Sequence, residues 1–151
     1  MSCRATTTLL VVRHGDRAGA MDALNPPGTV RAHALVHVGE HASVKAVYHS
    51  DTARTRDTAA PIATALNLVP TERPANDVSA LLDEIFDAHR GETVLVVGHS
   101  NTVPEIIAAA GGPRVPAISD DEFDKLFVLS ACGCWFPSAT LVTLQYGAPS
   151  Q

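Results

Sequence analysis

Two short apolar runs in this chain each end at a histidine. Leu9–Arg13 is followed by His14 and Gly15, and Thr93–Gly98 is followed by His99. Continuous apolar runs of this length are typical of strands that are buried on both faces of a parallel sheet. Because parallel strands end at the same edge of a sheet, both histidines are predicted to lie there. That edge is where open α/β sheets bind their ligands.

Strand-like and helix-like patterns alternate along the rest of the chain. Further strands are predicted at 44–48, 69–72, 126–131 and 139–146, and helices at 29–42, 52–66, 78–89 and 101–110. This alternation predicts a largely parallel sheet with helices on both faces, which is a three-layer α/β/α sandwich. Turn residues separate the last two strands, which predicts a closing hairpin at one edge of the sheet.

Local signals mark the ends of the predicted helices. The sequence Asn-Pro-Pro-Gly at 25–28 indicates a turn that leads into the first helix. Ser50 or Asp51 is predicted to cap the second helix, and Pro61 is predicted to kink or restart it. Asn67 stands where a left-handed residue is expected after that helix.

Composition and charge restrict the kinds of protein this chain can be. With 46% hydrophobic and 18% charged residues, the chain is too apolar for disorder, and residues 1–151 are predicted to form a single domain. The net charge of −5 at pH 7 excludes the basic surface of a nucleic-acid-binding protein. No apolar run approaches the roughly 18 residues of a membrane span, and residues 1–13 show no signal-peptide pattern.

The three cysteines are Cys3, Cys132 and Cys134. Cys132 and Cys134 could bind a metal or form a disulfide, but no second cysteine pair accompanies them. The sequence therefore favours small reduced thiols, and with them a protein of the reducing cytoplasm.

Three polar corners are predicted to meet at one edge of the sheet: Arg13-His14-Gly15, 50–56 and 98–101. They supply two histidines, at least two arginines and the N-terminus of the helix after His99. Guanidinium forks and the free backbone N–H groups of a helix N-terminus both suit a phosphate group. A neutral imidazole among them can attack phosphorus, and cationic neighbours are expected to lower the pKa of His14 and keep it nucleophilic.

Together these segments resemble the histidine phosphatase superfamily, also called phosphoglycerate mutase-like. Arg13-His14-Gly15 is similar to its Arg-His-Gly motif, 50–59 to its Ser-x-x-x-Arg-x-x-x-Thr-Ala segment, and 98–101 to its second-histidine corner. The resemblance implies a phosphoglycerate mutase-like fold. It also implies hydrolysis of phosphomonoesters or phosphohistidine through a covalent phosphohistidine intermediate, without a metal or other cofactor.

The resemblance implies a role for each matching residue. The implied catalytic residues are His14, Arg13, Arg54 and His99, and the implied substrate-binding residues are Arg17 and Ser100. His14 is the expected nucleophile, and the other three catalytic residues are expected to hold the phosphoryl oxygens. The expected partners are a small phosphorylated substrate or a phosphohistidine protein, with no nucleic acid and no membrane.

No strong general acid is evident in the sequence. Longer members of the family carry one in an insertion after the third strand, whereas here 72–77 is only a short loop. The chain therefore resembles the short members, including phosphohistidine phosphatases, and Asp16, Glu72 and Asp77 are its candidate acids. Aryl phosphates and phosphohistidine are expected to react best, because they release good leaving groups.

Three alternatives remain at this level, and the sequence leaves the oligomeric state open. A mutase would return the phosphoryl group to its substrate, but the short loop offers little shielding from water. A non-catalytic phosphate-binding or phosphoprotein-binding module would not need His14. A metal stripe of His33, His37 and His41 is conceivable, although no carboxylate or cysteine accompanies it.

Several other polar and aromatic residues are interpreted as structural. His49 is expected to be a satisfied residue at a strand end, and Arg56 to be solvated. The acidic group Asp120, Asp121, Glu122 and Asp124 is interpreted as a solvated loop, and the aromatic group Phe127, Trp135 and Phe136 as edge-strand core.

Overall fold

A six-stranded sheet in the order β3-β2-β4-β1-β5-β6 forms the centre of the computed structural model, which describes residues 5–134 and 136–151. The strands are β1 (Thr7–Arg13), β2 (Val44–His49), β3 (Thr71–Glu72), β4 (Thr93–Gly98), β5 (Lys125–Cys132) and β6 (Ser138–Gln145). The helices are α1 (Pro26–Ala42), α2 (Ala53–Ala65), α3 (Val78–Ala88) and α4 (Thr102–Ala109).

The four strands β3, β2, β4 and β1 run parallel, so their carboxyl ends share one edge of the sheet. Leu10 pairs with Leu95, which confirms the predicted alignment of the two histidine-ended strands. β5 runs antiparallel to β1, with Leu126 opposite Val12, so β5 begins where β1 ends. β6 closes the sheet as the predicted antiparallel hairpin partner of β5.

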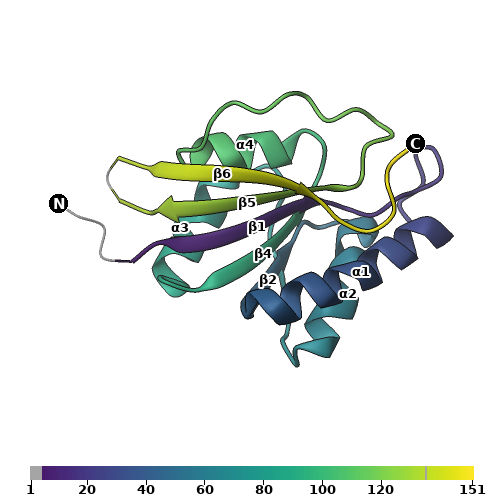
Figure 1. Cartoon of the computed structure of the whole chain (residues 1–151), viewed down its shortest axis with the longest axis horizontal. Coiled ribbons are helices and arrows are strands. Elements are labelled where there is room, and N and C mark those ends of the chain that lie inside the picture. Colours follow the sequence, from purple (N-terminus) through teal and green to yellow (C-terminus); the bar gives the residue numbers. More distant parts are fainter. Residues whose placement is uncertain (1–4, 135) are drawn as a thin grey trace.

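Helices α1 and α2 pack against one face of the sheet, and α3 and α4 pack against the other (Figure 1). Alternate residues of β1 enter two separate cores, since Leu9 contributes to the core that holds α3 and α4 and Leu10 to the core that holds α1 and α2. Continuous apolar strands are needed here because both faces are buried. The predicted three-layer α/β/α sandwich with a mostly parallel sheet is confirmed.

The ends of α1 and α2 differ in detail from the sequence prediction. α1 begins at Pro26, because prolines suit the first helical turn, and the Asn25 side chain accepts a hydrogen bond from the backbone N–H of Gly28. α2 is capped by Thr52 rather than by Ser50 or Asp51. The hydroxyl of Ser50 is instead bonded to the His99 ring, and the carboxylate of Asp51 accepts a bond from a loop N–H.

Pro61 does not interrupt α2, which continues through it to Ala65. The proline lacks only the N–H that would bond to the carbonyl of Asp57. Both residues are half-buried, so the helix continues with this one hydrogen bond missing. After the helix, Asn67 has a φ of 55°, which confirms the predicted left-handed residue.

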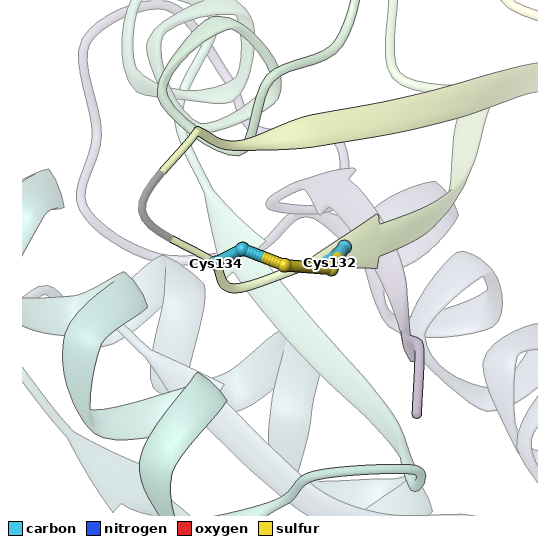
Figure 2. Close-up of a disulfide and its surroundings, with 2 residues drawn as sticks. All are labelled: Cys132 and Cys134. Atoms are coloured by element: carbon cyan, nitrogen blue, oxygen red, sulfur yellow. A yellow bond between two sulfur atoms is a disulfide. The ribbon is translucent and has the colours of Figure 1, made fainter. Parts of the chain in front are cut away.

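Cys132 and Cys134 form a disulfide at the end of β5, so the prediction of reduced thiols is wrong for this pair (Figure 2). The two Cα atoms lie 5.5 Å apart, within the range that a disulfide spans. Because β5 is antiparallel to β1, this disulfide lies at the sheet edge opposite the histidines. Cys3 lies outside the described residues.

The aromatic group divides in the structure. Phe127 is buried in the core, as predicted, whereas Phe136 is 82% exposed, so its assignment to the core is wrong. It lies between β5 and β6. Trp135 lies outside the described residues. No helix among the described residues is long and apolar enough to cross a membrane.

Candidate active site

The polar corners predicted from the sequence meet at the carboxyl edge of the parallel strands. The backbone N–H of His14 donates to the carbonyl of Gly98 at 2.9 Å, which joins the ends of β1 and β4. The rings of His14 and His99 lie 5.6 Å apart between their centroids. Segment 119–123 reaches the same edge, because it leads into the antiparallel strand β5.

The His14 ring is held in one tautomer. Its Nδ1 lies 2.8 Å from the carbonyl oxygen of Gly15, and only a protonated Nδ1 can donate to that oxygen. Nε2 therefore carries the free lone pair of the neutral ring. Gly15 is fixed in turn, since its N–H donates to the Thr58 hydroxyl at 2.8 Å.

Burial keeps His14 neutral. The residue is 2% exposed, and desolvation is the largest cause of a pKa lowered to about 3. The positive charges of Arg13 and Arg54 lower the pKa further, while the bond to Gly15 acts in the opposite direction. The predicted direction of the shift is confirmed, but burial contributes more than the cationic neighbours on which the prediction rested.

His99 adopts the opposite tautomer. Its Nδ1 accepts from Nη2 of Arg54 at 3.3 Å, so Nε2 carries the proton and donates to the Ser50 hydroxyl at 2.6 Å. Desolvation is the largest cause of a His99 pKa lowered to about 4, and the charge of Arg54 adds to it. Both site histidines are therefore neutral near pH 7.

Arg13 is almost fully buried, and three backbone carbonyls accept hydrogen bonds from its guanidinium. Its Nη1 donates to the carbonyls of Ser119, Asp120 and Glu122 at 2.9, 3.1 and 2.9 Å, and its guanidinium lies 4.1 Å from the centre of the Phe123 ring. Burial lowers its pKa below the ordinary value of arginine. Its Nε–H is buried and has no hydrogen-bond partner among the described residues.

Arg54 shares this unusual feature. Nη1 donates to the carboxylate of Asp22 at 2.7 Å and Nη2 to His99, yet the buried Nε–H has no partner among the described residues. An unpaired buried donor is costly, and a bound oxyanion would satisfy it. Two such donors beside a neutral imidazole suit a phosphoryl group.

Arg17 and Ser100 lie near this site without a resolved role. An open cleft of about 510 Å³ is lined by Arg17 together with Arg13 and Phe123, and by the carboxylate residues Asp120 and Asp121. This position is compatible with the predicted contact of Arg17 with substrate. Ser100 is half-buried and directly follows His99, two residues before α4 begins.

The three candidate general acids have other surroundings. Asp16 forms an ion pair with the buried Arg31 at 2.5 Å, and Asp77 caps α3 by accepting from the N–H of Ala80. Glu72 is exposed at the end of β3. Two of the three carboxylates are therefore engaged in structural contacts.

The structural interpretations are mostly confirmed. His49 is buried, with Nδ1 2.7 Å from the carbonyl of Ser50, and Arg56 is exposed and paired with Asp57. The interpretation of Asp124 as solvated is wrong, because this residue is 3% exposed. Its carboxylate accepts from the backbone N–H of Ser150 and so ties the C-terminal segment to the start of β5.

The metal-stripe alternative receives no support. His33, His37 and His41 are all exposed on α1. Among residues 5–134 and 136–151, no three His, Cys, Asp or Glu side chains are grouped so as to hold a metal ion.

The sequence analysis missed Asp22 and Phe123 as site residues, and it placed Ser50 in the 50–56 corner without its bond to His99. Ser50 is the first residue of the Ser-x-x-x-Arg segment and directly follows a strand, so its position indicated a residue at the edge of the sheet where the site lies. Asp22 and Phe123 come from irregular loops. Asp22 lies 31 residues before Ala53, the first residue of α2, which it contacts, and Phe123 lies just before β5. No periodic pattern indicates which way such loop residues point.

Comparison with known proteins supports the fold. A profile described as the histidine phosphatase superfamily (branch 1) matches residues 9–76. The mycobacterial glucosyl-3-phosphoglycerate phosphatase superposes with a TM-score of 0.74 at 16% identity, covering 93% of this chain and 99% of that one. The protein histidine phosphatase SixA, complexed with tungstate, gives a TM-score of 0.72 at 18% identity, covering 91% and 96%.

A candidate phosphohistidine phosphatase SixA from Nakamurella multipartitia gives a TM-score of 0.65 at 24% identity, covering 97% of this chain and 100% of that one. No curated protein matches the chain in sequence. The profile match contains the ends of β1 and β2 and the whole of α2, and with them His14 and Arg54. The predicted phosphoglycerate mutase-like fold is thereby confirmed.

Proposed function

We propose that this chain is a histidine phosphatase, a metal-independent phosphatase that works through a covalent phosphohistidine on His14, since the superfamily profile matches residues 9–76 around that histidine. The observation that carries this proposal is the His14 tautomer. Its Nδ1–H is bonded to Gly15, which leaves an unprotonated Nε2 beside two arginines whose buried Nε–H groups have no partner in the part of the chain that the structure describes. Residues 1–151 act as one domain in this proposal.

In the first step, the Nε2 lone pair of His14 forms a bond to phosphorus as the bond to the leaving oxygen or nitrogen breaks. Arg13 and Arg54 donate to the phosphoryl oxygens and stabilise the charge that spreads over them. His99 takes up a proton when the dianion binds, since a nearby negative charge raises the pKa of an imidazole, and then also donates. In the second step, water attacks phosphorus and releases phosphate from His14.

The proposed substrates release good leaving groups. Asp16 and Asp77 are held in structural contacts, so neither is free to protonate a poor leaving group. Aryl phosphates and phosphohistidine do not need strong acid assistance. A small phosphorylated molecule or a phosphohistidine protein is therefore the proposed partner.

A mutase activity fits the structure less well. Only residues 73–77 separate β3 from α3, so no long insertion there covers the phosphorylated histidine. Water can then reach the intermediate, which favours hydrolysis over return of the phosphoryl group.

The proposal also keeps the cytoplasmic location predicted from the sequence. The disulfide between Cys132 and Cys134 is the observation against that location, because such bonds persist in oxidising compartments.

Hydrolysis of p-nitrophenyl phosphate in the presence of EDTA tests the proposed function. Wild-type protein is expected to be active, and His14→Ala to lose on the order of 1,000-fold or more in kcat, because the nucleophile is removed. His37→Ala is the matched control, since this histidine is exposed on α1, and it is expected to retain activity. Loss of activity with EDTA, or activity retained by His14→Ala, would contradict the proposal.

A further inference from the structure

The carboxylate of Asp22 occupies a position beside the proposed phosphate pocket that the reaction described above does not use. Oδ1 accepts from Nη1 of Arg54 at 2.7 Å and from the Arg54 backbone N–H at 3.4 Å. Oδ2 accepts from the backbone N–H of Ala53 at 3.2 Å. These contacts hold the pKa of Asp22 below its usual value, so the group is a carboxylate throughout the neutral range.

Backbone hydrogen bonds hold the loop that carries Asp22. An isolated bridge joins Arg17 to Leu24, and the N–H of Asn25 donates to the carbonyl of Asp16 at 3.0 Å. Within the loop, the N–H of Met21 donates to the carbonyl of Ala18 at 3.0 Å. The loop is therefore closed at its base and turned at its tip, although the Asp22 side chain is 56% exposed.

Asp22 places a negative charge on the guanidinium that is expected to bind substrate. Nη1 of Arg54 is engaged by the carboxylate, whereas its Nε–H, which has no partner within residues 5–134 and 136–151, remains for a phosphoryl oxygen. Asp120 and Asp121 contribute further carboxylates to the cleft that Arg13 and Arg17 line. Carboxylates therefore lie beside both arginines that are expected to bind the phosphoryl group, Asp22 at Arg54 and Asp120 and Asp121 in the cleft of Arg13.

We propose that Asp22 is a specificity-determining residue, which holds Arg54 in place and selects against substrates with a second anionic group close to the phosphoryl group. The inference rests on the proposed phosphatase function. A second carboxylate on the substrate would lie near Asp22 in a partly solvated site, where like charges repel each other. Phosphoryl groups on neutral or cationic carriers, such as a histidine side chain of a protein, avoid this cost.

The test compares two substrates that differ only in charge, 3-carboxyphenyl phosphate and 3-carbamoylphenyl phosphate. Wild-type protein is expected to favour the neutral amide in kcat/KM by about fivefold. Asp22→Asn keeps the hydrogen-bonding shape and loses the charge, so it is expected to reduce that preference at least about threefold. Asp22→Glu restores the charge and is expected to restore the preference.

Asp57→Asn is the matched control, because Asp57 pairs with the exposed Arg56 on the same helix and should not affect the ratio. A purely structural role for Asp22 would lower kcat/KM for both substrates together and leave their ratio unchanged. An unchanged ratio in Asp22→Asn, or an equal change in Asp57→Asn, would overturn the proposal.

Binding measurements separate this proposal from the proposed function. The dissociation constants of the same two phosphates can be measured by calorimetry on His14→Ala, with and without Asp22→Asn. If the wild type binds but does not hydrolyse them, the phosphatase proposal fails. A charge preference in binding that Asp22→Asn reduces would still support selection by Asp22. If His14→Ala shows no charge preference, or binds neither compound, the role of Asp22 is refuted.

Discussion

At the residue scale, the two site histidines are oriented by different partners into opposite tautomers. His14 donates from Nδ1 to a backbone carbonyl, whereas His99 donates from Nε2 to the hydroxyl of Ser50. That hydroxyl is itself placed by Thr55, whose Oγ1 lies 3.0 Å away. The arrangement leaves Nε2 of His14 free for chemistry and turns Nδ1 of His99 toward Arg54. The proposed roles of these residues therefore depend on neighbours that carry no catalytic chemistry themselves.

Ser50→Ala is expected to weaken catalysis through His99. The substitution leaves a buried Nε2–H without its acceptor, and such a loss costs about 1–3 kcal/mol. We expect kcat/KM for p-nitrophenyl phosphate to fall on the order of tenfold. Ser50→Thr can restore the hydroxyl and is expected to recover part of the activity. Full activity in Ser50→Ala would show that the hydrogen bond does not position His99.

At the element scale, the start of α1 packs directly against the turn that follows β1. A Cβ atom added at Gly28 would overlap the carbonyl oxygen of Asp16, and one added at Gly15 would lie 2.8 Å from the carbonyl oxygen of Gly28. The ion pair between Asp16 and Arg31 of α1 fastens the same contact. Backbone thus meets backbone without intervening side chains, so the position of α1 helps to fix the turn that holds His14.

Gly28→Ala is expected to disturb both the fold and the site. The added methyl group meets backbone atoms, which cannot rotate away, so we expect a loss of about 1–3 kcal/mol in the free energy of unfolding. A fall in kcat/KM should accompany this loss. Denaturant unfolding and hydrolysis of p-nitrophenyl phosphate measure the two effects.

Gly39→Ala is the matched control on the same helix. Its methyl group would meet the far end of the flexible Ile62 side chain, on the contact between α1 and α2. We expect it to change stability while kcat/KM stays near the wild-type value. Equal effects of the two substitutions on kcat/KM would contradict a direct link between Gly28 and the turn.

At the scale of the whole molecule, folding places two neutral histidines in a buried site. The pKa values of His14 and His99 are lowered to about 3 and about 4, below the ordinary value of 6.5. The unfolded chain therefore binds more protons than the folded one between these values and pH 6.5. Stability conferred by the neutral rings is present above pH 6.5 and is lost as the pH falls toward the folded-state pKa values.

The stability of the protein is accordingly expected to decrease on acidification. Between pH 7 and pH 5, linkage predicts a loss of about 2 kcal/mol in the free energy of unfolding for each of the two histidines. His14→Asn should remove roughly half of this dependence. Urea unfolding at a series of pH values measures it, and the exposed His37→Asn is expected to keep the wild-type slope. Equal slopes in His14→Asn and the wild type would contradict the burial argument.

The sequence by itself determined the order of strands and helices along the chain, the layers and the sheet edge at which the candidate site residues meet. Continuous apolar strands require burial on both faces, and parallel strands bring the residues after them to one edge. His14 and His99 follow such strands directly, and Arg54 lies in the first turn of the helix after β2, so their meeting could be predicted from local pattern. The left-handed conformation of Asn67 was also predictable from the sequence, because asparagine is one of the few residues that adopt a positive φ.

Only the tertiary structure decided which side chains occupy the remaining positions around the site. Asp22 and Phe123 lie in irregular loops, where no periodicity indicates direction, and they reach the site through contacts between distant segments. The capping of α2 by Thr52 also depends on such contacts, because Ser50 is bonded to His99. The pairing of Cys132 with Cys134 depends on the 5.5 Å between their Cα atoms. The local sequence shows which side chains are able to cap a helix or form a hydrogen bond. Which of the possible partners each one bonds depends on the distances between segments in the folded chain.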